Sequence, residues 1–321
     1  MTSKDLLKVN NLKVYYRSPA GKVKAVDGVS FTLGENEVLG IVGESGCGKS
    51  TLATAILKLT RPPCYIEDGE VIFDGKNLLD LEGEDLRRIR WKELSYIPQG
   101  SMNSLNPVMK IGDQIVDVMM AHTEISKEEA KEKAGKLLES VGLPSETINM
   151  YPHELSGGMK QRVIIAIATA LEPKLIVADE FTTALDVLVQ RKVIEFLEER
   201  RASIGASMIN ITHDIAVQAM LAHKLAVMYA GKIVELSDVY TIFEEPLHPY
   251  TKGLIMATPV LGEKKVIRGI PGNPPNLLNP PPGCRFYPRC TIAENKCKHK
   301  SPPLMKIEEG RYVACWKYGG E

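Results

Sequence analysis

The sequence has 321 residues, enough for about two compact domains at roughly 150 residues each. Hydrophobic residues make up 44% of it and charged residues 25%, which is typical of a folded globular protein and excludes a disordered or fibrous chain. Lys plus Arg and Asp plus Glu number 40 each, so the bulk charge gives no field that would attract nucleic acid or anionic lipid.

The sequence shows no signal for membrane insertion or export. The longest apolar run, residues 163–171, is far shorter than the roughly 18 residues of a membrane span and predicts a buried helix. The first eleven residues hold no apolar signal segment, so secretion is not expected. If this protein serves a membrane, we expect it to act from the cytoplasmic side.

The first predicted elements are strands. Residues 7–16 and 23–33 alternate apolar and polar side chains, as half-buried strands do. Residues 37–42 form a short apolar strand that leads directly into a glycine-rich turn.

That turn reads GESGCGKS over residues 43–50 and fits the phosphate-loop pattern G-x-x-x-x-G-K-[ST]. In such a loop backbone N–H groups surround phosphates, Lys49 reaches the β- and γ-phosphates, and Ser50 offers a hydroxyl to Mg²⁺. A chance glycine-rich turn is the alternative, and the flanking strand and helix argue against it. The predicted ATP-binding residues here are Gly43, Ser45, Gly46, Cys47, Gly48, Lys49, Ser50 and Thr51.

The middle of the chain alternates helices and strands. Residues 126–141 predict a helix that begins with a capping box, and residues 174–178 predict a buried strand. A helix over 186–201, capped by Asp186, and a buried strand over 207–211 follow. Strands separated by helices predict a mainly parallel sheet covered by helices.

Two acids follow the strand at 174–178. Asp179 could hold Mg²⁺ through water, and Glu180 is placed to polarise a water molecule for attack on the γ-phosphorus. The alternative is that Asp179 and Glu180 are merely two solvated acids at the end of a strand. The phosphate loop earlier in the chain argues against that alternative.

Residues 155–162, LSGGMKQR, open an apolar helix and resemble the signature motif of ABC-type ATPases. A serine and two glycines at a helix N-terminus can form a second anion site, although a serine-capped helix start is the simpler interpretation of those three residues alone. One chain cannot place both anion sites on one nucleotide, so the resemblance implies a dimer. It implies that these residues of one subunit act on the partner's nucleotide: Ser156, Gly157, Gly158 and Asp186.

Further positions match the same family. Gln99 resembles the Q-loop glutamine that contacts Mg²⁺ and couples to the membrane partner, and residues 184–186 resemble the D-loop. His213, which closes the strand at 207–211, resembles the switch histidine on the γ-phosphate, whereas a histidine met alone there is more often structural. Tyr16 is the expected adenine-stacking residue, with Tyr15 as the alternative.

The resemblance assigns roles to the site residues. It implies catalytic roles for Glu180, His213, Lys49 and Gln99. It implies Mg²⁺ ligation by Ser50, Gln99 and Asp179. The sequence departs from the family at Phe181, where proline is usual, and at residues 98–101, PQGS. Neither departure touches a group expected to contact phosphate or Mg²⁺.

A subfamily is also indicated. Residues 104–107, 248–251, 270–275 and 283–290 resemble the ATPase subunits of dipeptide/oligopeptide importers. That resemblance implies a peripheral protein at the cytoplasmic face of a bacterial or archaeal membrane, and no nucleic-acid partner. Its implied partners are a second, different ATPase subunit, two permease subunits and an extracellular solute-binding protein. Some relatives carry oligosaccharides, so an oligosaccharide cargo is the alternative to peptide.

Four of the six cysteines crowd the last 38 residues, namely Cys284, Cys290, Cys297 and Cys315. Without an export signal such a cluster suggests a metal or iron–sulfur site before disulfides. The spacing C-x5-C-x6-C-x17-C lacks the close pairs of zinc fingers, whereas four thiolates can hold a [4Fe–4S] cluster. Some members of the resembling subfamily carry such a cluster at these positions. Zinc, or four unliganded thiols in a docking tail, are the alternatives.

Together these features predict an α/β ABC-type P-loop ATPase over residues 1–240. It should have a mixed or parallel core sheet, an N-terminal antiparallel β subdomain and a helical insert at about 100–160. Residues 241–321, dense in proline, should form a loop-rich metal-binding appendage.

The expected reaction is ATP plus water to ADP plus phosphate, powering an importer. One rival is a soluble ABC ATPase acting on ribosomes or DNA, which usually fuses two cassettes or inserts a coiled coil. The other is an iron–sulfur redox protein with a vestigial nucleotide site.

Overall fold

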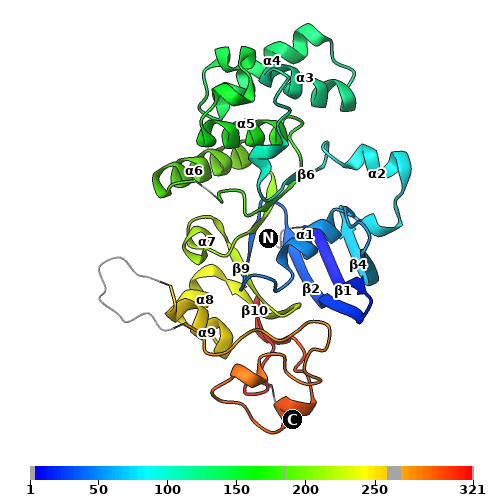
Figure 1. Cartoon of the computed structure of the whole chain (residues 1–321), viewed down its shortest axis with the longest axis vertical. Helices are drawn as coiled ribbons and strands as arrows, with labels where there is room; N and C mark the ends of the chain where they lie inside the picture. The colour runs from blue at the N-terminus through cyan, green and yellow to red at the C-terminus, as the bar shows by residue number, and fades with distance from the viewer. Residues whose placement is uncertain (1–3, 184, 259–268, 320–321) are drawn as a thin grey trace. The chain divides into compact units, whose positions relative to one another are not determined.

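The computed structural model describes residues 4–183, 185–258 and 269–319 (Figure 1). The chain divides into two compact units. Unit 1 comprises Met1–Lys4, Gly34–Glu37 and Asp80–Asn210. Unit 2 comprises Asp5–Leu33, Val38–Leu79 and Ile211–Glu321.

Unit 2 begins with an antiparallel sheet, drawn as blue to cyan arrows in Figure 1. Its strands lie in the order β2-β1-β4-β5. They are β1 (Asp5–Ser18), β2 (Gly21–Gly34), β4 (Cys64–Phe73) and β5 (Lys76–Asn77). β1 pairs antiparallel with β4, and β4 with β5. The two predicted N-terminal strands and the antiparallel β subdomain are therefore confirmed.

The second sheet of unit 2 contains the strand that leads into the phosphate loop. Within this unit its strands lie in the order β11-β12-β10-β9-β3. They are β3 (Val38–Val42), β9 (Lys224–Tyr229), β10 (Lys232–Asp238), β11 (Met305–Glu308) and β12 (Arg311–Val313). β3 and β9 are parallel and the other pairs are antiparallel, so the sheet is mixed.

The segment after residue 240 contributes more regular structure than its proline content predicts. β12 pairs with β10 and so extends the core sheet. The helices of unit 2 are α1 (Lys49–Ile56), α7 (Ile215–Leu221), α8 (Val239–Glu244), α9 (Pro249–Met256) and α10 (Lys296–His299), with a 3₁₀ turn at Tyr287–Arg289.

An aromatic cluster joins this C-terminal segment to the sheet. Tyr229 at the end of β9 packs on Tyr250 of α9 with ring centroids 4.6 Å apart, and edge-on against Phe286 at 5.2 Å. All three side chains are buried, so they supply apolar area and ring–ring contacts together. The C-terminal segment is therefore part of the core of unit 2.

Unit 1 holds three buried strands in the order β8-β7-β6. They are β6 (Leu94–Ile97), β7 (Leu175–Asp179) and β8 (Ser207–Ile211). β6 and β7 are parallel. The strands predicted at 174–178 and 207–211 are thus present.

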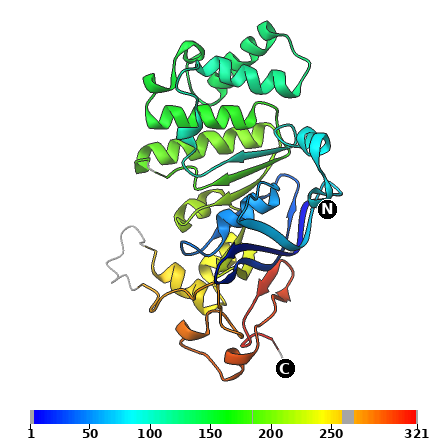
Figure 2. The same cartoon turned by 45° about the vertical axis from the view of Figure 1, so that its right-hand side comes forward.

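The helices of unit 1 include those drawn as green coils in Figure 2. They are α2 (Gly83–Ile89), α3 (Ile111–His122), α4 (Lys127–Ser140), α5 (Gly157–Thr169) and α6 (Val187–Ser203). In unit 1, 3₁₀ turns occupy Ser101–Ser104, Ser145–Asn149 and Pro152–Glu154. Another, Leu78–Asp80, lies where the chain passes from unit 2 to unit 1. The predicted caps are present: Ser126 accepts the Glu129 N–H at 3.2 Å, and Asp186 accepts the Val189 N–H at 3.0 Å. The domain boundary near residue 240 stays a prediction.

Across the described residues, none of the helices combines the length and apolar character that crossing a bilayer requires.

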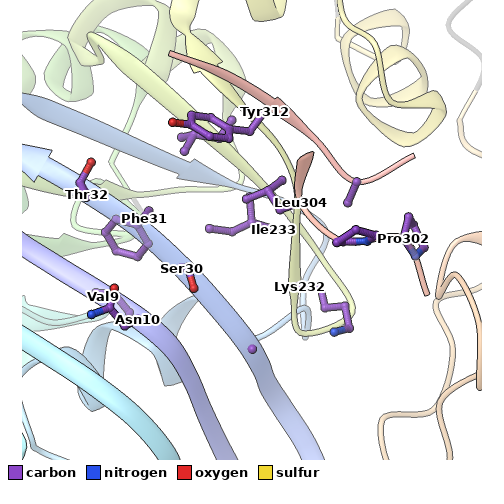
Figure 3. A pocket seen from close by; sticks show the side chains of 14 residues that line it. Val9, Asn10, Ser30, Phe31, Thr32, Lys232, Ile233, Pro302, Leu304 and Tyr312 are labelled. Carbon is purple, nitrogen blue, oxygen red and sulfur yellow. The ribbon is translucent and has the colours of Figure 1, made fainter. Parts of the chain in front are cut away.

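Unit 2 also contains an open cavity of about 460 Å³ between β2, β10 and the C-terminal segment (Figure 3). Phe31, Ile233, Leu304 and Tyr312 are among its apolar lining residues. Lys232 lies at its edge, and its ammonium donates to the carbonyl of Asp27 at 3.0 Å. None of the predicted site residues lines this cavity.

Candidate nucleotide-binding site

The phosphate loop lies between β3 and α1, and its backbone requires glycine at two positions. Gly43 has φ of 155°, and a Cβ there would lie 2.1 Å from the carbonyl oxygen of Met228. Gly48 has φ of 107°, and a Cβ there would lie 2.1 Å from the carbonyl oxygen of Ala25. Both positions combine a backbone that favours glycine with no room for a side chain. The motif glycines are therefore structural requirements of this loop.

Lys49 lies inside the loop that precedes it. Its side chain is 6% exposed, and its ammonium donates to the carbonyl oxygens of Gly43 at 2.8 Å and Glu44 at 3.3 Å. Ser50 is exposed in the first turn of α1, where the free backbone N–H groups of a helix attract anions. An ammonium, a hydroxyl and a helix N-terminus form a donor set that fits a polyphosphate and its Mg²⁺.

The two candidate adenine-stacking tyrosines have different surroundings. The hydroxyl of Tyr16 lies 3.0 Å from the Thr51 hydroxyl, and its side chain is half-buried beside the loop. Tyr15 is buried, donates to Asp27 at 2.7 Å and meets Tyr65 edge-on. Burial, and then the Asp27 carboxylate, raise the pKa of the Tyr15 hydroxyl. Tyr15 is a core residue, whereas Tyr16 is available to a ligand.

Unit 1 brings the predicted Mg²⁺ ligand and the predicted base together at the end of β7. Asp179 is 1% exposed and accepts the Tyr96 hydroxyl at 3.4 Å. Gln99 donates to the Glu180 carboxylate at 2.8 Å. Glu180 has φ of 45°, a left-handed conformation that costs roughly 1–3 kcal/mol and is concentrated at functional positions. Thr183 donates to the Glu180 carbonyl at 2.8 Å and supports this conformation.

The signature residues form the N-terminus of α5. Ser156 is exposed, and its hydroxyl accepts the Met159 N–H at 3.4 Å. A Cβ at Gly158 would lie 2.5 Å from Val189, so this glycine allows close packing of α5 on α6. Asp186 is exposed as the cap of α6. Ala184 of the predicted D-loop lies outside the described residues.

The predicted residues divide between the two units. Unit 2 holds the phosphate loop, Tyr16 and His213, which is exposed directly before α7. Unit 1 holds Gln99, Ser156, Gly157, Gly158, Asp179, Glu180 and Asp186. Within each unit the residues occupy loops at strand ends or helix N-termini, where binding groups are usually found.

Two residues far along the chain contact the phosphate loop, and the sequence pattern did not predict either contact. Tyr250 accepts the backbone N–H of Glu44 at 2.8 Å, and Arg289 binds the Glu44 carboxylate with two nitrogens. Both lie in motifs quoted above, but no spacing in the sequence relates positions more than 200 residues apart to this loop.

The four C-terminal cysteines line one cavity in unit 2, together with His248, Phe286 and Trp316. The cysteines of the described chain are free thiols. Burial raises the pKa of the Cys284 thiol to about 11. Among the described residues no three His, Cys, Asp or Glu side chains are arranged to hold a metal ion, so the predicted metal site is not seen as such.

Comparison with solved structures defines the class. The structure is similar to that of the ATP-binding cassette MJ0796 in its dimeric post-hydrolysis state bound to ADP and Pi, with a TM-score of 0.65 and 28% identity. The match covers 73% of this chain and 98% of that chain. Residues 26–183 match the family model described as ABC transporter. The fold and the phosphate loop are those of an ABC-type P-loop ATPase.

Comparison with relatives narrows the class to a family. Residues 234–297 match the model described as oligopeptide/dipeptide transporter, C-terminal region. The oligopeptide transport ATP-binding protein OppD of Bacillus subtilis is 46% identical over 97% of this chain and 88% of its own length. The dipeptide transport ATP-binding protein DppD of Caldanaerobacter subterraneus subsp. tengcongensis is 45% identical over 98% and 97%. The chain belongs to the ATP-binding subunits of oligopeptide/dipeptide ABC importers, and its activity is ATP hydrolysis coupled to transport.

Proposed function

We propose that the chain binds ATP through the phosphate loop at Gly43–Thr51 and hydrolyses it with Glu180 as the general base. The observation that carries the proposal is the loop itself, in which a buried Lys49 lies inside a turn whose Gly43 and Gly48 admit no side chain. This is the geometry that backbone binding of phosphates requires.

The proposed reaction assigns one role to each group. Glu180 takes a proton from water as the water oxygen attacks the γ-phosphorus and the bond to the ADP oxygen breaks. Lys49 and His213 stabilise the charge on the γ-phosphate. Ser50, Gln99 and Asp179 would hold Mg²⁺, which neutralises phosphate charge when bound. The 2.8 Å hydrogen bond between Gln99 and Glu180 supports the assignment of both to one step.

We propose that the working form pairs this chain with a second, different ATPase subunit. Ser156, Gly157, Gly158 and Asp186 would then act on the nucleotide of the partner. The exposed N-termini of α5 and α6 support this, as do Val187 and Leu188, which are 79% and 77% exposed directly after Asp186. Two large apolar side chains so open to water favour burial against a partner.

We propose that the dimer drives two permease subunits from the cytoplasmic face of the membrane, with peptides delivered by an extracellular solute-binding protein. The names of the two relatives support di- or oligopeptides as cargo. Reconstitution with the partner subunits in liposomes tests this, because ATP-dependent uptake of a labelled tripeptide is expected. Uptake of a labelled oligosaccharide, and not of peptide, would contradict the peptide proposal and support an oligosaccharide importer.

The substitution Glu180→Gln tests the hydrolysis mechanism. It removes the proposed base but keeps a side chain that Gln99 can contact, so we expect steady-state hydrolysis to fall about 10²- to 10⁴-fold while ATP binding is retained. The trapped ATP should also stabilise the subunit pair in size-exclusion chromatography. Glu195→Gln on the exposed face of α6 is the matched control and should keep the wild-type rate. An unchanged rate in Glu180→Gln would favour the rival redox protein with a vestigial nucleotide site.

We further propose that Cys284, Cys290, Cys297 and Cys315 hold a [4Fe–4S] cluster with a structural role. The observation in favour is that all four line one cavity. A zinc ion requires its sulfur ligands about 2.3 Å from a single point, whereas the corners of a cluster accept more widely separated thiolates.

Metal analysis of the anaerobically purified protein tests the cluster. About four irons and four acid-labile sulfides per chain are expected. Cys290→Ser should lose them, and Cys64→Ser, which changes a buried cysteine of β4, should keep them. Zinc, or no metal, in the wild-type protein would remove the cluster proposal and leave the ATPase proposal intact.

A further inference from the structure

The second residue of the phosphate loop, Glu44, carries a negative charge where negative phosphates are expected to bind. Its two carboxylate oxygens accept hydrogen bonds from the two terminal nitrogens of Arg289, at 2.7 and 2.9 Å. This is a bidentate pair, the strongest geometry between a guanidinium and a carboxylate. The Arg289 side chain is 4% exposed and the Glu44 side chain 27% exposed, so water reaches the pair only from the side of the carboxylate.

Arg289 is fixed by further contacts that orient it toward the loop. Its Nε donates to the carbonyl of Pro271 at 2.8 Å, and a terminal nitrogen donates to the carbonyl of Ile270 at 3.1 Å. The guanidinium carbon lies 5.7 Å from the ring centre of Tyr229 and 5.9 Å from that of Phe286. The side chain is thus held in place by contacts with the protein itself.

Tyr250 holds the backbone of the same loop residue. Its buried hydroxyl accepts the Glu44 N–H at 2.8 Å, and its ring packs on Tyr229. Glu44 is therefore bound through its backbone by α9 and through its carboxylate by the 3₁₀ turn at Tyr287–Arg289. Both anchors come from the C-terminal segment of unit 2.

We propose that Arg289 is a positioning residue of the nucleotide site: it neutralises Glu44 and holds it, so that the loop accepts a polyphosphate. An unpaired carboxylate in the loop would repel each phosphate charge, and the repulsion would grow from AMP to ADP to ATP. The C-terminal segment thereby sets how tightly the site binds ATP. This inference rests on the proposed nucleotide site.

Isothermal titration of the full-length chain with ATP, ADP and AMP tests the proposal. Arg289→Met should weaken ATP binding about tenfold or more, ADP less and AMP least. The loss should shrink when the salt concentration is raised, because ions screen a charge–charge repulsion. In the double variant Glu44→Gln/Arg289→Met, ATP affinity should return to within about threefold of wild type, since the repelling charge is gone.

Arg311→Met is the matched control, because Arg311 is a buried arginine of the same C-terminal segment whose hydrogen bonds go to Glu308 and the Glu245 carbonyl. It should lower the melting temperature without changing ATP affinity. Equal weakening of all three nucleotides by Arg289→Met, with no recovery in the double variant, would mean a merely structural role and overturn the proposal.

If Arg289→Met does not fold, Glu44→Gln alone decides. It should bind ATP at least as tightly as wild type, and weaker binding contradicts the proposal. Lys49→Ala separates this inference from the proposed function. If the wild type binds no ATP, or Lys49→Ala binds it equally well, the nucleotide site itself is wrong, whatever Arg289→Met does.

Discussion

Tyr15 and Tyr16 are adjacent in β1, and only their surroundings distinguish them. Period-2 alternation places neighbouring strand residues on opposite faces of a sheet, so one must be core if the other faces the loop. The sequence left both open because each fits an aromatic near a strand end. Tyr15 is buried and hydrogen-bonded to Asp27, whereas Tyr16 is half-buried and contacts Thr51 of the loop, which favours Tyr16 as the stacking residue.

Tyr16→Ala should weaken ATP, ADP and AMP binding by a similar factor of about three- to tenfold, because stacking on adenine contributes roughly 0.5–1.5 kcal/mol whatever the number of phosphates. Titration with the three nucleotides measures it. The control Tyr15→Phe should lower the free energy of unfolding by about 1 kcal/mol and leave the affinities unchanged. A loss of affinity in Tyr15→Phe but not in Tyr16→Ala would reverse the assignment.

The local sequence pattern was sufficient to predict some of the site residues but not others. The phosphate loop was predictable because its glycines, Lys49 and Ser50 follow one another at fixed local spacing between a strand and a helix. The pair of Glu44 with Arg289 was not, since the two residues are 245 positions apart and their contact depends on how the C-terminal segment folds onto β9. Residue spacing in the sequence predicts local backbone geometry, but it does not predict which distant residues come into contact in the fold.

At the scale of elements, the cap of α9 makes that helix sensitive to pH. His248 is 2% exposed, and its Nδ1 accepts the Tyr250 N–H at 3.1 Å, which requires the neutral ring. Burial lowers the pKa of His248 from 6.5 to about 3. Because the unfolded chain takes up this proton first, the stabilisation is complete above pH 6.5 and is lost as the pH falls toward 3.

Between pH 7.5 and 5.5 the His248 contribution should reduce the free energy of unfolding by about 1.4 kcal/mol. His248→Asn keeps a capping acceptor and should lack this slope. Denaturant unfolding at both pH values, with the variant subtracted, isolates the effect. The subtraction is needed because Glu235 accepts the backbone N–H of His248 and also titrates. Burial raises the pKa of Glu235, so its contribution to the free energy of unfolding changes with pH in the opposite direction. Equal slopes in the two proteins would contradict the assignment.

The elements that the sequence predicted well are those buried on one face or fully. β3, β7 and β8 are mostly apolar, and every residue in them is buried, including the polar Asp179, Ser207 and Asn210. β11 is different, because none of its four residues is buried and its alternating run Met305–Glu308 is too short to indicate a strand by itself. It is a strand because β12 beside it pairs with β10, and that partner is not visible locally.

For the whole molecule, the C-terminal segment belongs to the core of unit 2 in addition to any role in metal binding. β12 covers the edge of β10, and Tyr250 and Phe286 cover Tyr229. Removing the segment would expose a strand edge and a set of aromatic side chains, both of which promote aggregation.

A chain that ends at Asp238 should therefore fail to accumulate as a folded monomer, although the sequence motifs of the ATPase all remain in it. Solubility, circular dichroism and light scattering, with the full-length chain as control, measure this. A truncated chain that unfolds cooperatively and binds ATP as the full chain does would instead support an independent domain that ends near residue 240.

The pairing of Glu44 with Arg289 also limits how far this phosphate loop can be transplanted. An engineer who grafts GESGCGKS into a cassette that ends before the equivalent of the C-terminal segment would introduce the carboxylate without its guanidinium. We expect such a chimaera to bind ATP poorly although its motif is perfect, and a graft with glutamine at the position of Glu44 to bind better. Two proteins with the same loop sequence can thus differ in nucleotide affinity because of residues that no motif search would compare.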